Sequence, residues 1–280
     1  MKPLFQGVCT ALITPFRLDF VHMEVYDQLL DRQLKAGVTA LVVCGTTGES
    51  ATMTDTEKLD LIGHTVDYVQ GRCKVLAGTG SNCTTHAITL SKEAEKLGAD
   101  GLLLVSPYYN KATEAGLIAH YTAIGDQVHI PCIVYNVPSR TGVNIPVSVY
   151  KALAQHPNFC GVKEASGNFS AIAEIMQLSD GAVDLYSGND DQIVPLLALG
   201  GKGVISVLSN IAPRTAHDIC EKFFQGDLEG SRKLQLKALP LIKALFCEVN
   251  PIPVRAALNL MGKQVGAPRL PLTEMEPDHQ

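Results

Sequence analysis

Eight short apolar runs recur along the chain and alternate with longer stretches of helical periodicity, and no other feature restricts the fold as strongly. The runs occupy residues 8–16, 40–45, 74–80, 100–109, 131–137, 159–165, 183–188 and 203–209. Most of them are continuously apolar in the middle rather than alternating, which is typical of parallel strands buried on both faces. The pattern predicts an α/β fold with eight β–α units, namely a (β/α)8 TIM barrel.

The stretches between the runs carry signals for where helices begin and end. Thr54 or Asp55 suits an N-cap, and Glu57 follows Thr54 at the spacing of a capping box. Gly37 and Gly98 stand where the helices before the second and fourth runs should stop. These signals support a helix before each of those runs, as a β–α repeat requires.

Residues 210–280 follow the eighth run, and one closing helix does not account for them. Residues 228–246 and 251–262 have the periodicity of amphipathic helices, and Pro240 is expected to kink or break the first of them. We therefore expect a barrel over residues 1–225 and a C-terminal α-helical segment over 226–280. A doubly wound open sheet is the alternative, because a count of repeats does not prove closure. Its common fingerprints, G-x-G-x-x-G and G-x-x-x-x-G-K-[ST], are absent from the sequence.

Composition narrows the functional classes. The formal net charge is -5 and no dense run of Lys and Arg occurs, so the chain does not resemble a nucleic-acid-binding protein. The apolar runs are too short and broken to span a membrane, and residues 1–16 indicate a first strand rather than a signal peptide. The eight cysteines form no C-x-x-C pair and no zinc-finger spacing, which predicts a reducing, cytoplasmic setting without disulfides.

Lys163 lies inside the sixth apolar run, where a charged amine is costly to bury. One interpretation is that the strand ends at Val162 and that Lys163 points into water. The other is that Lys163 is held in a pocket, where its neutral amine can attack a carbonyl. Taken alone, this run favours the first interpretation, since structural lysines outnumber reactive ones.

Polar residues at the ends of other runs shift the balance. Gly45-Thr46-Thr47-Gly48-Glu49 follows the second run and could hold a small carboxylate with hydroxyl and backbone N–H groups, or could form a simple tight turn. Tyr135 and Arg140 follow the fifth run, where a phenol suits proton transfer and a guanidinium suits carboxylate binding. A turn with a solvated arginine is the alternative. In a barrel, these residues and Lys163 meet at one rim, the C-terminal face of the strands.

Five strings in this order resemble the dihydrodipicolinate synthase family: GTTGES (45–50), SPYYNKA (106–112), YNVPSRTG (135–142), GVKEASG (161–167) and SGND (187–190). The family belongs to the pyruvate-dependent, Schiff-base-forming aldolase/lyase superfamily. The resemblance spans nearly the whole chain, including the helical C-terminal segment.

The resemblance implies a lyase that condenses pyruvate with L-aspartate 4-semialdehyde in lysine and diaminopimelate biosynthesis, without a metal or organic cofactor. Lys163 would form the Schiff base with pyruvate, and Tyr135 would be the proton shuttle beside it. Thr46 and Tyr109 would complete a hydroxyl relay with Tyr135. The family pattern also implies a homotetramer, a dimer of dimers in which Tyr109 crosses the tight interface.

The same resemblance implies the substrate-binding residues. Thr46 and Thr47 would hold the pyruvate carboxylate, and Arg140 would bind the carboxylate of the semialdehyde. Gly188 and Ile205 match main-chain positions that line the pocket.

Two other functions remain open at this point. Neuraminate lyase, in the same superfamily, has Ser-Thr where this chain has Thr46-Thr47 and lacks the arginine that matches Arg140, so both features favour the semialdehyde. A non-catalytic barrel that only binds a ligand is the other alternative. It would have no need of a reactive amine, and trapping by borohydride with pyruvate separates the two cases.

Many family members are inhibited by lysine at the dimer interface. Ser50, Ala51, Asn82 and Tyr108 match positions of that site in this resemblance. His86 and Lys58 stand where sensitive members often carry glutamate and histidine, and Asp55 also departs from the pattern. Since an added cation repels a cationic effector, we expect weak or absent inhibition, unless Asp55 or a main-chain carbonyl replaces the lost anion.

Overall fold

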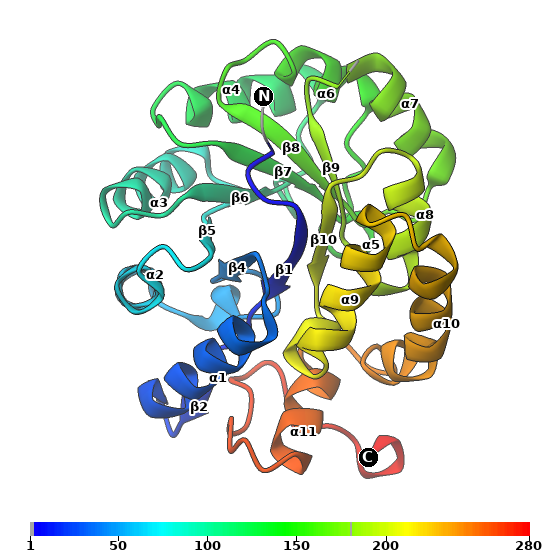
Figure 1. The fold of residues 1–280 in the computed structure, drawn as a ribbon. Helices are drawn as coiled ribbons and strands as arrows, with labels where there is room; N and C mark the ends of the chain where they lie inside the picture. The colour runs from blue at the N-terminus through cyan, green and yellow to red at the C-terminus, as the bar shows by residue number, and fades with distance from the viewer. Residues whose placement is uncertain (1–2, 180) are drawn as a thin grey trace.

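The computed structural model describes residues 3–179 and 181–280. Within these residues, parallel strands close into a barrel in the order β1-β10-β9-β8-β7-β6-β5-β4 (Figure 1). The barrel strands are β1 (Gly7–Ala11), β4 (Ala40–Val43), β5 (Lys74–Gly78), β6 (Gly101–Val105), β7 (Cys132–Asn136), β8 (Phe159–Glu164), β9 (Asp184–Ser187) and β10 (Gly203–Ser206). Because β1 pairs with both β10 and β4, the sheet is closed. The predicted TIM barrel is confirmed and the open sheet is excluded.

Helices cover the outside of the barrel, as the ring around the strands in Figure 1 shows. The longer ones between the strands are α1 (Met23–Ala36), α2 (Asp55–Val69), α3 (Thr84–Lys96), α4 (Glu114–Gly125), α6 (Val147–Leu153), α7 (Phe169–Ser179), α8 (Ile193–Ala198) and α9 (Pro213–Phe224). The expected end signals are confirmed for α1 and α2. Gly37 caps α1 in a left-handed conformation with φ 80°, and Thr54 and Glu57 form a capping box at the start of α2.

The first apolar run is shorter as a strand than predicted. β1 ends at Ala11, and Phe16 belongs instead to a small hairpin of β2 (Phe16–Arg17) and β3 (Phe20–Val21). Pro15 has no N–H to donate to a ladder, which accounts for the interruption between the two elements.

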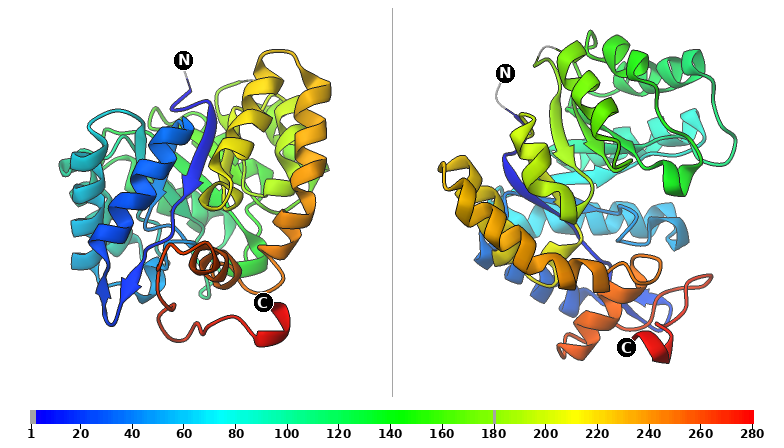
Figure 2. Two further views of the ribbon diagram at one scale, coloured as in Figure 1. Left: turned by 60° about the horizontal axis from the view of Figure 1, so that its bottom comes forward. Right: turned by 90° about the vertical axis from the view of Figure 1, so that its right-hand side faces the viewer.

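Two further helices follow the barrel: α10 (Leu228–Ala244) and α11 (Ile252–Leu260). Helix α10 packs against α9, and α11 lies at the end of the barrel toward which the strand arrows point (Figure 2). Pro240 does not break α10, which continues to Ala244. None of the helices in the described residues is long and apolar enough to cross a membrane.

The core has two layers. One cluster of apolar side chains lies between the strands and the surrounding helices, and a smaller one fills the barrel interior. On β7 the two-residue period sends Ile133 and Tyr135 into the interior, while Val134 packs against the helices.

Candidate active site

Lys163 points into the barrel because of its position on β8. Val162 packs with the helices on the outside, so the residue after it faces inward. The Lys163 side chain is buried, its residue being 6% exposed, and it lies opposite Tyr135 of the neighbouring strand. Its Nζ atom is 4.0 Å from the centroid of the Tyr135 ring. The interpretation with Lys163 in water is therefore wrong.

Glu164 faces the other way. Its buried carboxylate accepts hydrogen bonds from Asn136 Nδ2 at 3.1 Å and from the backbone N–H of Ser166 at 2.6 Å. The Glu164 carboxylate is therefore bound by Asn136 and Ser166 on the outer face of the barrel. It does not pair with the Lys163 amine.

A cavity of about 200 Å³ opens above Lys163 at the C-terminal ends of the strands. It is lined by the predicted residues Lys163, Tyr135, Thr46, Thr47, Arg140 and Gly188, and by Ala11, Val42, Gly45, Leu103, Val137, Ser139, Ala165, Asn189, Val207, Phe246 and Asn250. None of these described lining residues is acidic, whereas two carry cationic groups. The cavity therefore suits substrates that carry carboxylates.

The loop after β4 brings Thr46 and Thr47 to the cavity in a constrained backbone. Cys44 and Glu49, on either side of the loop, both have φ 56°, a left-handed conformation that non-glycine residues rarely adopt. Glu49 is held by a buried ion pair with Arg255 of α11, and its Oε2 accepts the backbone N–H of Arg269 at 3.0 Å. The C-terminal segment thus fixes one end of this loop.

Arg140 lies on α5 (Pro138–Thr141), the short helix directly after β7. Its Nη2 donates to the backbone carbonyl of Asn250 at 2.9 Å, and Asn250 Nδ2 donates to Thr47 Oγ1 at 3.0 Å. Asn250 and Phe246 were not predicted from the sequence. Thr47 and Asn250 are 203 positions apart, and no local pattern around Asn250 indicates that contact.

Gly188 lines the cavity, and the buried Asp190 follows it two positions further along the chain. A Cβ at Gly188 would lie 2.7 Å from Ala165 Cβ, so a side chain would collide there. Asp190 is buried and accepts from Ser206 Oγ at 2.5 Å and from the Val207 N–H at 2.9 Å. Burial raises the pKa of the Asp190 carboxyl, and these hydrogen bonds oppose that rise.

Two predicted site residues are not among those that line the cavity. Ile205 is packed in the interior cluster, and Val207, two positions further on, takes a place in the wall instead. Tyr109 is 90% exposed on the surface of the single chain, with φ 72°.

A second cavity, of about 650 Å³, adjoins the first and shares Thr46, Val137, Arg140 and Asn250 with it. The residues predicted for a regulatory site that line it are Ser50, Ala51, His86 and Tyr108. Asn82 is not in this wall, but its Nδ2 donates to the Tyr108 carbonyl at 3.2 Å.

Asp55 sits beside this second cavity between two partners, the imidazole of His86 and the ammonium group of Lys58. Its carboxylate is 2.8 Å from His86 Nε2 and 3.1 Å from Lys58 Nζ. Burial alone would raise the pKa of Asp55, but the hydrogen bonds from His86 and Lys58 lower it overall. Its charge is therefore already compensated within the chain.

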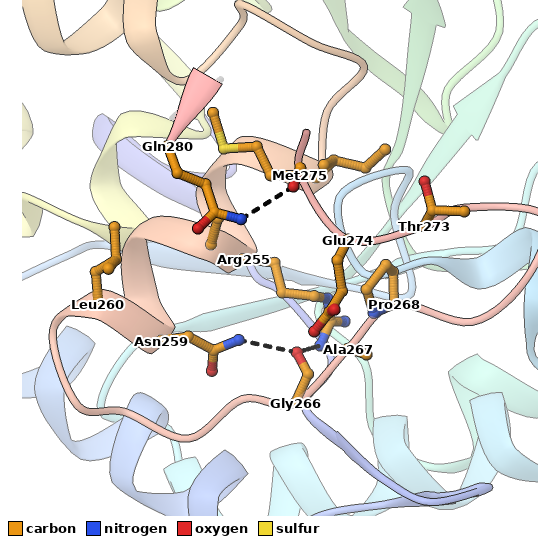
Figure 3. Close-up of a pocket in the computed structure, with 12 residues that line it drawn as sticks. Arg255, Asn259, Leu260, Gly266, Ala267, Pro268, Thr273, Glu274, Met275 and Gln280 are labelled. Atoms are coloured by element: carbon orange, nitrogen blue, oxygen red, sulfur yellow. Dashed lines mark hydrogen bonds between the residues drawn. The ribbon is translucent and has the colours of Figure 1, made fainter. Parts of the chain in front are cut away.

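A third hollow, of about 400 Å³, lies between α11 and the C-terminal residues (Figure 3). Arg255, Asn259 and Glu274 are among the residues that line it, and it shares none with the lysine cavity. Among residues 3–179 and 181–280, no group of His, Cys, Asp or Glu is arranged to hold a metal ion.

Comparisons with known proteins agree with this geometry. The family model of the dihydrodipicolinate synthetase family matches residues 4–280. A curated 4-hydroxy-tetrahydrodipicolinate synthase from Caldicellulosiruptor saccharolyticus is 57% identical over 274 residues, which are 98% of this chain and 92% of that protein.

Solved structures of the family are also similar to this chain. The dihydrodipicolinate synthase of Thermotoga maritima matches with a TM-score of 0.96 and 45% identity, over 99% of this chain and 95% of that one. The chloride-inhibited enzyme of Acinetobacter baumannii, solved in complex with pyruvate, matches with a TM-score of 0.96 and 38% identity, over 98% and 95% of the two chains.

Proposed function

This chain belongs to the dihydrodipicolinate synthetase family, and on that premise we propose which of its residues carry out each part of the family's reaction. The enzyme condenses pyruvate with L-aspartate 4-semialdehyde through a lysine Schiff base and forms 4-hydroxy-tetrahydrodipicolinate, in lysine and diaminopimelate biosynthesis. One observation supports the residue assignment above all: the buried Nζ of Lys163 lies 4.0 Å from the centre of the Tyr135 ring, in a cavity that also contains Arg140.

Lys163 is the nucleophile. Its neutral amine adds to the C2 carbonyl of pyruvate, water leaves, and an iminium forms. The iminium withdraws electrons, so the pyruvate methyl loses a proton and becomes an enamine. The enamine carbon attacks the aldehyde, and the amino group of the semialdehyde then displaces Lys163 as it closes the ring.

Tyr135 and Thr46 move the protons. Each step above transfers one proton over a short distance, so hydroxyl groups at the cavity wall are suitable carriers. Tyr135 is the group next to the reacting nitrogen, and Thr46 lies at the junction between this cavity and the second one. That position supports Thr46 as the link in a relay toward solvent.

Two subsites hold the two carboxylates. The hydroxyls of Thr46 and Thr47 bind the carboxylate of pyruvate, and the main chain of Gly188 in the cavity wall completes that subsite. Arg140 binds the carboxylate of the semialdehyde, for which its planar guanidinium offers paired donors.

Tyr109 completes the relay from a second subunit. Its 90% exposure and positive φ support a side chain that is held away from its own chain. We infer a tight dimer in which Tyr109 of one subunit reaches the relay of the other, and a homotetramer built from two such dimers.

The free cysteines support a reducing compartment. All eight lie in the described part of the chain and none is in a disulfide. The cytoplasm is the setting that we infer from this.

The second cavity is a regulatory site with weak affinity for lysine. Asp55, the carboxylate that we expected to replace the lost anion, is already paired with Lys58 and His86. The positively charged lysine would therefore approach an Asp55 carboxylate whose charge Lys58 already balances, and not a free carboxylate.

Turnover with two aldehydes tests the function. With pyruvate, the purified enzyme should consume aspartate 4-semialdehyde and should not use N-acetylmannosamine, the acceptor of neuraminate lyase. The reverse preference would contradict the assignment of Arg140, since a sugar presents no carboxylate.

A further inference from the structure

Asn250 connects the two proposed carboxylate subsites, although it comes from the C-terminal segment rather than from the barrel. Its side-chain Nδ2 donates to Thr47 Oγ1 at 3.0 Å, and its backbone carbonyl accepts from Arg140 Nη2 at 2.9 Å. The residue is buried, 5% exposed, and it lines the lysine cavity. One residue thus contacts a group from each subsite.

The direction of the first hydrogen bond determines what Thr47 can do. A hydroxyl has one hydrogen to donate and two lone pairs to accept with. Since Thr47 Oγ1 accepts from Asn250, its own hydrogen is free to point elsewhere. Among the described residues, the structure records no acceptor for that hydrogen, and the Thr47 side chain faces the cavity.

We propose that Asn250 is a positioning residue that makes Thr47 a hydrogen-bond donor to the carboxylate of the keto acid and fixes Arg140 beside it. This proposal rests on the proposed function, because it assumes that pyruvate occupies the subsite next to Thr47. Asn250 needs no contact with either substrate in this role. It acts through the orientation of the Thr47 hydroxyl and through its own main chain.

The proposal makes an unusual prediction for two substitutions. Asn250→Ala removes the donor but leaves the Thr47 hydroxyl free to rotate. Asn250→Asp is the closer match in shape, but a carboxylate only accepts hydrogen bonds. It would therefore accept the hydrogen of the Thr47 hydroxyl, which in this proposal is donated to the pyruvate carboxylate. It would also add negative charge to a cavity wall without any acidic residue. We therefore expect Asn250→Asp to be worse than Asn250→Ala.

The experiment measures covalent trapping and turnover in the full-length enzyme. Trapping by borohydride is followed against pyruvate concentration, and kcat/KM is determined separately for pyruvate and for the semialdehyde. In Asn250→Ala, kcat/KM for pyruvate should fall about fivefold, the value of one neutral hydrogen bond. In Asn250→Asp, it should fall by roughly a further tenfold or more. In Asn250→Ala, kcat/KM for the semialdehyde should change less than about twofold, because the backbone carbonyl that accepts from Arg140 remains.

Asn259→Ala is the matched control. Asn259 is also an asparagine of the C-terminal segment, but its Nδ2 donates to the Gly266 carbonyl at 3.1 Å in the third hollow (Figure 3). This variant should keep the wild-type half-saturation for pyruvate. Thermal unfolding of each variant shows whether it is folded. If Asn250→Ala is unfolded, the comparison of pyruvate trapping in Asn250→Asp and in wild type tests the proposal.

Two results overturn the proposal. One is an Asn250→Asp enzyme whose pyruvate binding equals that of wild type. This would mean that only the shape of the Asn250 side chain matters. The other is a loss in Asn250→Ala that exceeds the loss in Asn250→Asp. If the wild type itself forms no adduct, the proposed function fails instead, so the two failures are distinguishable.

Discussion

At the scale of residues, the position of Lys163 is the main support for its proposed role as the nucleophile. It is the buried lysine among the described residues, and the face of the Tyr135 ring lies next to its nitrogen. The negative face of an aromatic ring stabilises a cation, so the Tyr135 ring suits the positively charged iminium that we propose forms on Lys163.

Arg140 should matter for one substrate only. In Arg140→Ala, the borohydride adduct with pyruvate should still form, because Lys163 and the threonines are intact. The value of kcat/KM for the semialdehyde should fall roughly a hundredfold, as expected for a lost charge-assisted pair of hydrogen bonds. Arg214→Ala, which removes an exposed arginine on α9, is the control and should leave both values unchanged. Equal loss of trapping and of aldehyde use would contradict separate subsites.

The sequence could indicate the candidate site residues because their positions follow directly from strand ends. Lys163, Tyr135 and Arg140 each stand at the end of a recognisable apolar run, and a barrel brings such ends together. Asn250 could not be predicted in this way. It lies between two helices of the C-terminal segment, and its contact with Thr47 depends on how that segment folds back.

At the scale of elements, the loop that carries Thr46 and Thr47 depends on the C-terminal segment. Arg255 pairs with Glu49, and Arg269 contacts Glu57 at the start of α2 with both its terminal nitrogens, at 3.0 and 2.6 Å. The left-handed residues at either side of the loop are disfavoured on their own, so such anchors compensate for the strain. The sequence predicted the helices of this segment but not their role as an anchor.

The contact between Arg269 and Glu57 should make stability depend on pH. The hydrogen bond from Arg269 is the main cause that lowers the pKa of Glu57 from its usual 4.5 to about 2. A lowered pKa means that the pair stabilises the fold above about pH 4.5 and loses this effect as the pH falls toward 2. The difference in Tm between wild type and Arg269→Ala should therefore shrink as the pH is lowered from neutral to about 3. A difference that stays constant over this range would contradict the assignment.

The second cavity should respond to charge in a predictable direction. Sub-millimolar lysine should leave the wild-type turnover almost unchanged, because Asp55 is already paired. In His86→Glu, a carboxylate replaces one of the two partners of Asp55 and adds negative charge, so inhibition by lysine should become stronger. Activity measured against lysine concentration tests both statements. Strong inhibition of the wild type would show that the paired charges do not exclude the effector.

At the scale of the whole molecule, the repeat pattern predicted the barrel, but closure itself depends on contacts that no local pattern encodes. The number of β–α units was readable from apolar runs and helix signals, whereas closure requires β1 to pair with β10, the last strand of the barrel and far away in sequence. The hairpin of β2 and β3 was missed because its strands are too short to give a periodic signal. The backbone N–H of Phe16 in β2 donates to the backbone carbonyl of Val265 in the C-terminal segment.

The proposed exchange of Tyr109 between subunits can be tested by complementation. Tyr109→Phe and Lys163→Ala enzymes should each be poorly active or inactive. When the two are unfolded together and reassembled, a mixed dimer has one site with an intact Lys163 and a Tyr109 from the other chain. Random mixing should then restore about a quarter of the wild-type activity. No recovery in a mixture that does form mixed dimers would show that Tyr109 does not cross between subunits.

The most direct measurement of the central claim is the mass of the chain after borohydride reduction with pyruvate, followed by peptide mapping. The account predicts one adduct per chain, on the peptide that contains Lys163, and none in Lys163→Ala. Lys151→Ala, which removes an exposed lysine, should still be trapped in full. An adduct on another lysine, or a wild-type chain that pyruvate leaves unmodified, would contradict the account.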